Sequence, residues 1–357
     1  LFTKVYFPTG TGKNDRGLSR KHIIESCNAS LKRLQTDHID LYQAHRFDYE
    51  TPLEETLSAF DDLIRQGKVH YIGVSNWKHT EIQDALKIQD DKGYNRIVSN
   101  QPSYSAIYRV IEAKIVPLCE REGISQIVYS PLAQGVLTGK YLPGKKVPID
   151  SRGANKNNSA QFMQGMMNDE FLGHVAKLQP IADAHGITMS QLALAWILSN
   201  PNVASAIMGA TKPKQVSENA KGSGIKLEAS VIKEINAALK AEIEEHRATQ
   251  MKLDQQQKQT LEQTAKIESI FNSTENIMMW TIDHDYEITA LNTNFIANMT
   301  ASFGEDVEKK NNIMSLLKGH VDQDLYQGQL QAFTNGFKGR PQQFELPLKN
   351  TEGDTIW

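Results

Sequence analysis

The chain has 357 residues, of which 39% are hydrophobic and 23% charged, and its formal net charge is −3. These values exclude an intrinsically disordered chain, which has fewer apolar residues and a larger net charge. They also exclude a general nucleic-acid binder, because 39 Lys and Arg do not outnumber 42 Asp and Glu. No apolar run approaches the roughly 18 residues of a membrane span. The two cysteines, Cys27 and Cys119, cannot form a disulfide framework, so a cytoplasmic location is expected.

Residues 1–240 alternate between short apolar runs rich in β-branched residues and segments with helical spacing of apolar residues. This alternation predicts an α/β fold, a parallel sheet with crossover helices that is either open or closed into a barrel. The predicted strands are Phe2–Phe7, Ile39–Gln43, Val69–Val74, Ile97–Gln101, Ile124–Tyr129 and Ala204–Met208. The predicted helices are Ser19–Leu34 with Ser19 as N-cap, 51–67, Val110–Arg121, Phe171–His185, Ser190–Leu198, Pro213–Ala220 and Ala229–Leu239.

An eight-stranded βα barrel needs two strands more than the six predicted ones. The chain begins with Leu1 rather than Met, inside an apolar run, and it ends at Trp357 just as a strand pattern begins. The expectation is therefore a (β/α)8 TIM barrel that lacks its first two βα units. Functional side chains of such barrels lie at the carboxyl ends of strands and in the loops that follow. Polar residues or glycines stand there in this chain: Lys4, His45, Ser75, Asn76, Gln101, Tyr129, Ser130, Gly209 and Thr211.

Two of these residues are suited to proton chemistry. Burial lowers the pKa of a lysine, so Lys4 could transfer a proton or tune a neighbour, or it could simply reach solvent from a strand end. His45 could polarise a carbonyl or relay a proton near neutral pH, or it could be a satisfied core histidine. The residues alone leave both pairs of alternatives open.

The segment from Gly209 to Lys214 lies between a predicted strand and a predicted helix. A helix N-terminus offers unpaired N–H groups and Lys212 adds charge, so a phosphate site is predicted here, with a solvated loop as the alternative. Lys140 and Arg152 could supply a second basic group from a long loop that could close over a ligand. No group of His, Cys, Asp and Glu has metal-ligand spacing, so no metal site is predicted.

Residues 1–240 contain six distinct sequence motifs, which follow one another in this order: Gly17–His22, Leu31–Arg46, Gly73–Trp77, Asn100–Tyr104, Tyr129–Tyr141 and Gly209–Asn219. Together they resemble the aldo-keto reductases, and most of all the branch that contains the potassium-channel β subunits. The resemblance implies a barrel that binds NADP(H) without a Rossmann domain. It also implies reduction of aldehydes or ketones by hydride transfer.

The resemblance also implies a role for each matching residue. Lys4 and His45 match two of the four catalytic residues of the family, but its proton-donating Tyr and its Asp have no match. This fragment is therefore expected to be inactive and to bind the cofactor weakly or not at all. Ser75, Asn76 and Gln101 would hold the nicotinamide carboxamide, and Tyr129 would stack on the ring. The phosphates and the adenosine would be bound by Ser130, Leu132, Gly135, Lys140, Arg152, Gly209, Thr211, Lys212 near the 2′-phosphate, Gln215, Glu218 and Asn219.

The composition changes from about Lys240 onward. Residues 241–266 are rich in Glu, Lys and Gln and contain no Pro or Gly, which predicts a linker helix rather than a strong coiled coil. Period-two patterns predict a hairpin, and further elements are predicted after it: strands Met279–Asp283, Tyr286–Leu291 and Phe344–Leu348, and helices Asn294–Phe303 and Leu325–Phe337. The order of Ile267–Thr274, the hairpin and Asn292–Phe295 resembles the opening of a PAS domain. Residues 267–357 are therefore expected to form an incomplete PAS-like α+β domain.

Two functions follow from these resemblances. The first is an NADPH-dependent reductase of small-molecule carbonyls, fused to a PAS module for sensing, signalling or dimerisation. The alternative is an NADP(H)-binding, redox-sensing regulatory subunit with little turnover. A third interpretation is an accidental join of two unrelated coding pieces. A homodimer through the linker helix or the PAS module is expected, whereas the carbonyl substrate and the PAS signal are not fixed by these residues.

Overall fold

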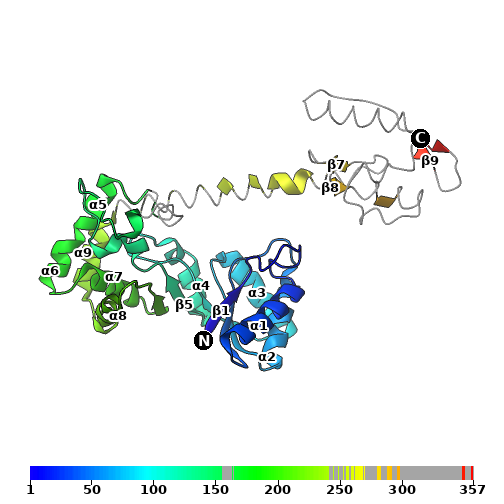
Figure 1. Ribbon diagram of the computed structural model, residues 1–357, viewed down its shortest axis with the longest axis horizontal. Coiled ribbons are helices and arrows are strands. Elements are labelled where there is room, and N and C mark those ends of the chain that lie inside the picture. Colours follow the sequence, from blue (N-terminus) through cyan, green and yellow to red (C-terminus); the bar gives the residue numbers. More distant parts are fainter. Residues whose placement is uncertain are drawn as a thin grey trace. The chain divides into compact units, whose positions relative to one another are not determined.

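The computed structural model describes residues 1–154, 163 and 165–240, together with short separate stretches between 244 and 356 (Figure 1). The chain divides into two compact units, Leu1–Met251 and Lys252–Trp357. This division falls within the predicted linker, residues 241–266. Among the described helices, none has both the length and the apolar character that crossing a membrane requires.

The first unit is built on one parallel sheet of six strands that lie side by side in chain order. All six predicted strands are confirmed, with bounds that shift by two residues at most: β1 (Phe2–Val5), β2 (Ile39–Ala44), β3 (Val69–Val74), β4 (Ile97–Asn100), β5 (Ser125–Tyr129) and β6 (Val203–Ile207). Within the described residues, β1 pairs only with β2 and β6 pairs only with β5, so the sheet is open. This arrangement is consistent with a partial TIM barrel.

Most crossover helices form where the apolar spacing predicts them. They are α1 (Arg20–Leu34), α2 (Leu53–Arg65), α4 (Ile115–Glu122), α7 (Met189–Leu198), α8 (Pro213–Ala220) and α9 (Ala229–Ala238). Ser19 caps α1 as predicted, since its Oγ accepts a hydrogen bond from the backbone N–H of His22 at 3.3 Å. One further helix, α3 (His79–Lys92), was not predicted; its signal in the sequence is the buried, helically spaced set Ile82, Ala85 and Leu86.

Two predicted helices are divided in the structure, and a proline lies beside each division. The predicted helix Phe171–His185 forms α5 (Asp169–Ala176) and α6 (Leu178–Ala184). Pro180 lacks an N–H group, and in a continuous helix its ring would collide with the carbonyl of the residue four positions earlier. That residue is Ala176, where α5 ends. The predicted helix Val110–Arg121 divides into the 3-10 turn η1 (Val110–Glu112) and α4. Pro117 lies in the first turn of α4, where a missing N–H costs little.

The apolar core of the first unit consists of two clusters. One packs α1, α2 and α3 against the first four strands and contains Ile23, Tyr42 and Trp77. The other packs α5, α6, α7 and α9 around β5 and β6 and contains Leu137 and Trp196.

In the second unit, β7 (Trp280–Ile282) and β8 (Ile288–Leu291) pair as antiparallel strands, with Trp280 opposite Leu291. This pairing confirms the predicted hairpin. A second antiparallel pair consists of β9 (Leu348–Lys349) and β10 (Thr355–Ile356). The predicted strand Phe344–Leu348 is described only at Leu348, and of the two predicted helices only residues 296 and 297 are described, as helical. The remaining parts of these elements lie outside the described residues.

Candidate functional site

The predicted site residues come to one edge of the sheet because all six strands are parallel. Lys4 lies in β1, His45 follows β2, Ser75 and Asn76 follow β3, and Gln101 follows β4. Tyr129 is the last residue of β5. Side chains from five neighbouring strands therefore lie at the same carboxyl edge.

Hydrogen bonds join five of these residues into one group, called here the carboxyl-end cluster: Lys4, Ser75, Asn76, Gln101 and Tyr129. Lys4 Nζ donates to Gln101 Oε1 at 2.9 Å, and Ser75 Oγ donates to the backbone oxygen of Gln101 at 2.8 Å. Asn76 Nδ2 donates a hydrogen bond to Ser75 Oγ at 3.0 Å, and the Tyr129 hydroxyl group donates one to Asn76 Oδ1 at 3.0 Å. One of these bonds, between Lys4 and Gln101, joins residues that are 97 positions apart in the chain.

Two titratable groups at this edge have shifted pKa values. Burial lowers the pKa of the Lys4 ammonium. Burial, together with the positive charges of Lys4 and Arg46, lowers the pKa of His45 to about 4. The edge of Phe7 meets the His45 ring with centroids 4.8 Å apart. His45 is therefore neutral at pH 7, and a neutral imidazole can donate a hydrogen bond to a carbonyl oxygen.

The lowered pKa of His45 predicts a pH dependence of stability. The folded protein binds a proton at His45 only near pH 4, whereas the unfolded chain binds one near pH 6.5. The contribution of His45 to the free energy of unfolding is therefore fully present above about pH 6.5, and it is lost as the pH drops towards 4. We expect the loss to be roughly 1–2 kcal/mol, since solvent screens this partly exposed ring. Urea unfolding of the wild type and His45→Gln across this range measures it, and parallel curves for the two proteins would contradict it.

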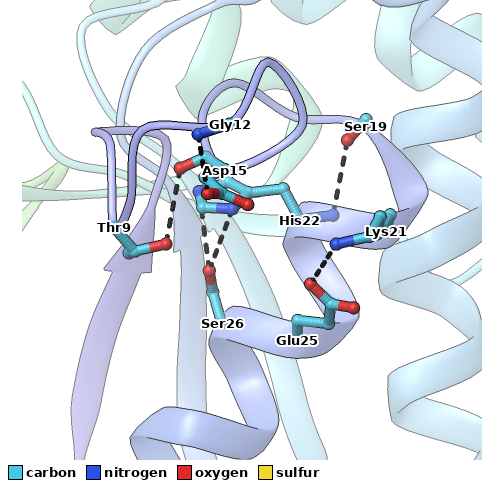
Figure 2. Close-up of polar contacts among 8 residues, drawn as sticks. All are labelled: Thr9, Gly12, Asp15, Ser19, Lys21, His22, Glu25 and Ser26. Atoms are coloured by element: carbon cyan, nitrogen blue, oxygen red, sulfur yellow. Dashed lines mark hydrogen bonds and ion pairs between the residues drawn. The ribbon is translucent and has the colours of Figure 1, made fainter.

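The loop after β1 is organised around Asp15 (Figure 2). Asp15 Oδ2 accepts a hydrogen bond from the backbone N–H of Gly12 at 3.0 Å, and the Asp15 carbonyl accepts one from Thr9 Oγ1 at 3.4 Å. The loop leads into α1, where the buried His22 ring lies 3.4 Å from Ser26 Oγ. The contacts of Asp15 therefore lie within the loop, and the contact of His22 lies within α1.

The loop after β5 contains the predicted phosphate ligands, and Gln134 connects several of them. Gln134 Nε2 donates to Ser130 Oγ at 2.6 Å, and its Oε1 accepts a hydrogen bond from Arg152 Nη1. A Cβ atom on Gly135 would lie 3.0 Å from Lys140 Nζ, so the lysine crosses directly over this glycine. Ser130, Gly135, Lys140 and Arg152 therefore lie around Gln134, a residue that the sequence patterns did not single out.

The remaining residues of this loop are less closely placed. Leu132 packs against the apolar core, with its side chain partly buried. The Lys140 ammonium lies 5.2 Å from the centre of the Tyr141 ring. Residues 155–162 and 164, which belong to the predicted closing loop, lie outside the described residues.

In the loop after β6, the groups that were predicted to bind an anion already have partners within the protein. Gln215 Oε1 already accepts hydrogen bonds from the backbone N–H groups of Thr211, at 2.8 Å, and Lys212, at 3.3 Å. Lys212 Nζ lies 3.5 Å from Asp150 Oδ2. An anion at the N-terminus of α8 would therefore compete with Gln215 for these N–H groups and with Asp150 for the lysine.

An open pocket of about 580 Å³ lies against this loop, lined by Ala210, Thr211, Lys212, Pro213, Val216, Ser217 and Ala220. Glu218 and Asn219 also lie in α8, but they do not line the pocket. The backbone oxygen of Glu218 accepts a hydrogen bond from Gln191 Nε2 at 2.9 Å, and its side chain pairs with Lys214 at 3.5 Å. Asn219 is half-buried, and a Cβ atom on Gly209 would meet no heavy atom within 4 Å.

Comparison with known proteins agrees with this architecture. Residues 1–240 match the profile of the "Aldo/keto reductase family". Over 222 residues the chain is 44% identical to the "Probable voltage-gated potassium channel subunit beta" of Arabidopsis thaliana, a match that covers 62% of this chain and 67% of that protein. Over 244 residues it is 42% identical to the "Putative voltage-gated potassium channel subunit beta" of Schizosaccharomyces pombe, covering 67% and 70% of the two chains.

A bacterial enzyme is also similar. The chain is 32% identical over 221 residues to the "L-glyceraldehyde 3-phosphate reductase" of Escherichia coli strain K12, which covers 61% of this chain and 63% of the enzyme. The chain thus spans about two thirds of the length of the curated relatives that it matches. Because the family profile covers residues 1–240, more than half of the chain, the protein belongs to the aldo/keto reductase family.

Proposed function

We propose that this chain binds NADP(H) at the carboxyl edge of its sheet, and that the protein reduces aldehydes or ketones by hydride transfer. One observation carries the proposal: the hydrogen-bonded carboxyl-end cluster, in which residues from four strands meet beside His45. Family membership supports the reaction class, and the E. coli relative is named a reductase.

The side chains at this edge fit a nicotinamide dinucleotide by their chemistry. A carboxamide both donates and accepts hydrogen bonds, and so do the amides of Asn76 and Gln101. The Tyr129 ring offers a flat surface on which an aromatic ring can stack. Lys140 and Arg152 supply positive charge for a diphosphate, with Ser130, Leu132 and Gly135 beside them. Lys212 would approach the 2′-phosphate, with Gly209, Thr211, Gln215, Glu218 and Asn219 around the adenosine.

The catalytic roles divide between two residues of this chain. When bound, NADPH supplies the hydride. His45, neutral at pH 7, would orient the substrate by donating a hydrogen bond to its carbonyl oxygen, where negative charge develops during reduction. Lys4 would tune the proton donor of the reaction through its own positive charge.

We further propose that these 357 residues alone are inactive as a reductase and bind the cofactor weakly. Lys4 and His45 match the catalytic set, but the family's Tyr and Asp have no match in this sequence. The proposed organisation is a partial barrel (1–240), a linker helix (241–266) and a PAS-like module (267–357). The hairpin of β7 and β8 supports the last assignment. The module would sense a signal or join two copies of the chain.

A second candidate function is an NADP(H)-binding regulatory subunit whose cofactor reports the redox state. The names of the plant and yeast relatives, a "Probable" and a "Putative voltage-gated potassium channel subunit beta", favour it. Turnover of 4-nitrobenzaldehyde with NADPH separates the two candidates, provided that the protein assayed also carries a segment with the Tyr and the Asp. Rapid turnover favours the reductase, whereas cofactor binding with negligible turnover favours the regulatory subunit.

The cofactor proposal predicts a contrast between two neighbouring lysines. Lys212→Ala should weaken NADPH binding about 10-fold and leave NADH binding unchanged, because only NADPH carries the 2′-phosphate that would pair with Lys212. Lys214→Ala is the matched control: Lys214 pairs with Glu218 and does not line the pocket. Isothermal titration with each nucleotide measures both affinities.

Two results would contradict the cofactor proposal. The first is the absence of any NADPH binding by the wild-type chain. The second is an equal loss of NADPH and NADH affinity in Lys212→Ala, which would mean that the lysine does not recognise the 2′-phosphate.

A further inference from the structure

A second group of side chains lies near the amino ends of β2 and β3, away from the carboxyl edge. His38 immediately precedes β2, Asp40 lies in β2, and His70 lies in β3. In the parallel register, Ile39 is opposite Val69, so Asp40 and His70 are also opposite each other. Because side chains alternate between the faces of a strand, His38 and Asp40 point to the same side.

The three side chains converge. One ring nitrogen from each histidine and one carboxylate oxygen of Asp40 lie within 4.8 Å of one another. The two imidazole rings are stacked, with centroids 4.6 Å apart and planes 21° from parallel. His70 Nδ1 lies 3.7 Å from Asp40 Oδ1. All three side chains are between 42% and 48% exposed, so an ion can reach them from solvent.

The surroundings of this group favour a cation. Asp37 Oδ1 lies 2.8 Å from His38 Nδ1. A carboxylate beside a histidine ligand orients the ring and increases its basicity, which strengthens metal binding. Asp40 Oδ1 is the carboxylate oxygen on the side that faces His70.

We propose that His38, Asp40 and His70 bind a divalent transition-metal ion of the zinc class. Two imidazoles and one carboxylate are ligands that Zn²⁺ prefers, whereas Mg²⁺ and Ca²⁺ prefer oxygen ligands alone. Ligand atoms around a tetrahedral zinc ion lie roughly 3.4 Å apart, given bonds of about 2.0–2.1 Å. Rotation of these partly exposed side chains would bring the three ligand atoms, which lie within 4.8 Å of one another, to this spacing. Water would complete the coordination, and the ion would link β2 to β3.

Isothermal titration of the tag-free chain with ZnCl₂ tests the proposal. We expect one zinc ion per chain, with loss of this binding in both His38→Gln and His70→Gln. Asp37→Asn should retain the site but weaken it roughly 10- to 100-fold, as expected for a residue that orients a ligand. MgCl₂ should not compete.

The controls address the other histidines and the fold. The chain contains 10 histidines, so His185→Gln, which removes an exposed histidine outside the group, should leave zinc binding unchanged. The circular dichroism spectra of the variants should match that of the wild type, because the replaced side chains are partly exposed. Zinc should also raise the melting temperature of the wild type but not of His70→Gln. Either no zinc binding by the wild type or unchanged binding by His70→Gln would overturn the proposal.

Discussion

Replacing Gly73 with alanine should lower the free energy of unfolding by about 3 kcal/mol, a large effect for the addition of one methyl group. Gly73 lies inside β3, next to β4. A Cβ atom there would lie 2.4 Å from Ser99 Oγ, 3.0 Å from the Ser99 backbone oxygen and 3.1 Å from Gln43 Cγ. Since one of these atoms belongs to the backbone of the neighbouring strand, rotation of the Ser99 side chain alone does not relieve the close contacts.

Two further variants separate this close contact from a general effect of removing glycine. Ser99→Gly removes the nearest atom, so the double variant Gly73→Ala, Ser99→Gly should recover part of the lost stability. Gly173→Ala is the matched control, because a Cβ atom on this glycine of α5 meets no heavy atom within 4 Å; it should stabilise the helix by about 0.5–1 kcal/mol. Urea unfolding followed by circular dichroism measures all three. Equal effects of Gly73→Ala and Gly173→Ala would contradict the packing explanation.

Gln101→Leu should impair both stability and cofactor binding. The buried Gln101 side chain accepts a hydrogen bond from Lys4, and leucine would leave this partly buried ammonium without that partner. We expect a loss of about 2 kcal/mol in the free energy of unfolding. The hydrogen bond from Ser75 should persist, because it ends on the backbone of Gln101. NADPH affinity should fall by about 10-fold or more, since one amide that would hold the carboxamide is removed.

A double variant separates these two effects. In Lys4→Met, Gln101→Leu the charge and its partner are both replaced by apolar groups, so much of the stability should return. NADPH binding should remain weak, because the amide is still missing. Unfolding curves and NADPH titrations on the same preparations give both quantities. If Gln101→Leu binds NADPH as tightly as the wild type, Gln101 does not hold the nicotinamide.

Local sequence patterns were sufficient to predict the strands and most of the helices of the first unit. The helices that were predicted wrongly or not at all have identifiable causes. The strands are short runs of β-branched residues, and α1 has a serine cap and one apolar face, so neighbouring residues determine where each begins. The division between α5 and α6 was not predicted, although Pro180 disfavours a continuous helix through Ala176. α3 was missed although Ile82 and Leu86 have helical spacing, since a polar sequence surrounds them.

By itself, the sequence determined the order of the six strands and of most helices in residues 1–240, and the polar residues at the ends of strands, because these depend on neighbours in the chain. Only the tertiary structure decided which of those residues meet. Lys4 and Gln101 are 97 positions apart, and His38 and His70 stack because β2 and β3 pair in one particular register. Register is selected by burial of one face of each strand against the helices, and a shift of one residue would turn every side chain to the other face. Contacts of this kind are therefore properties of the packed sheet rather than of any segment of the chain.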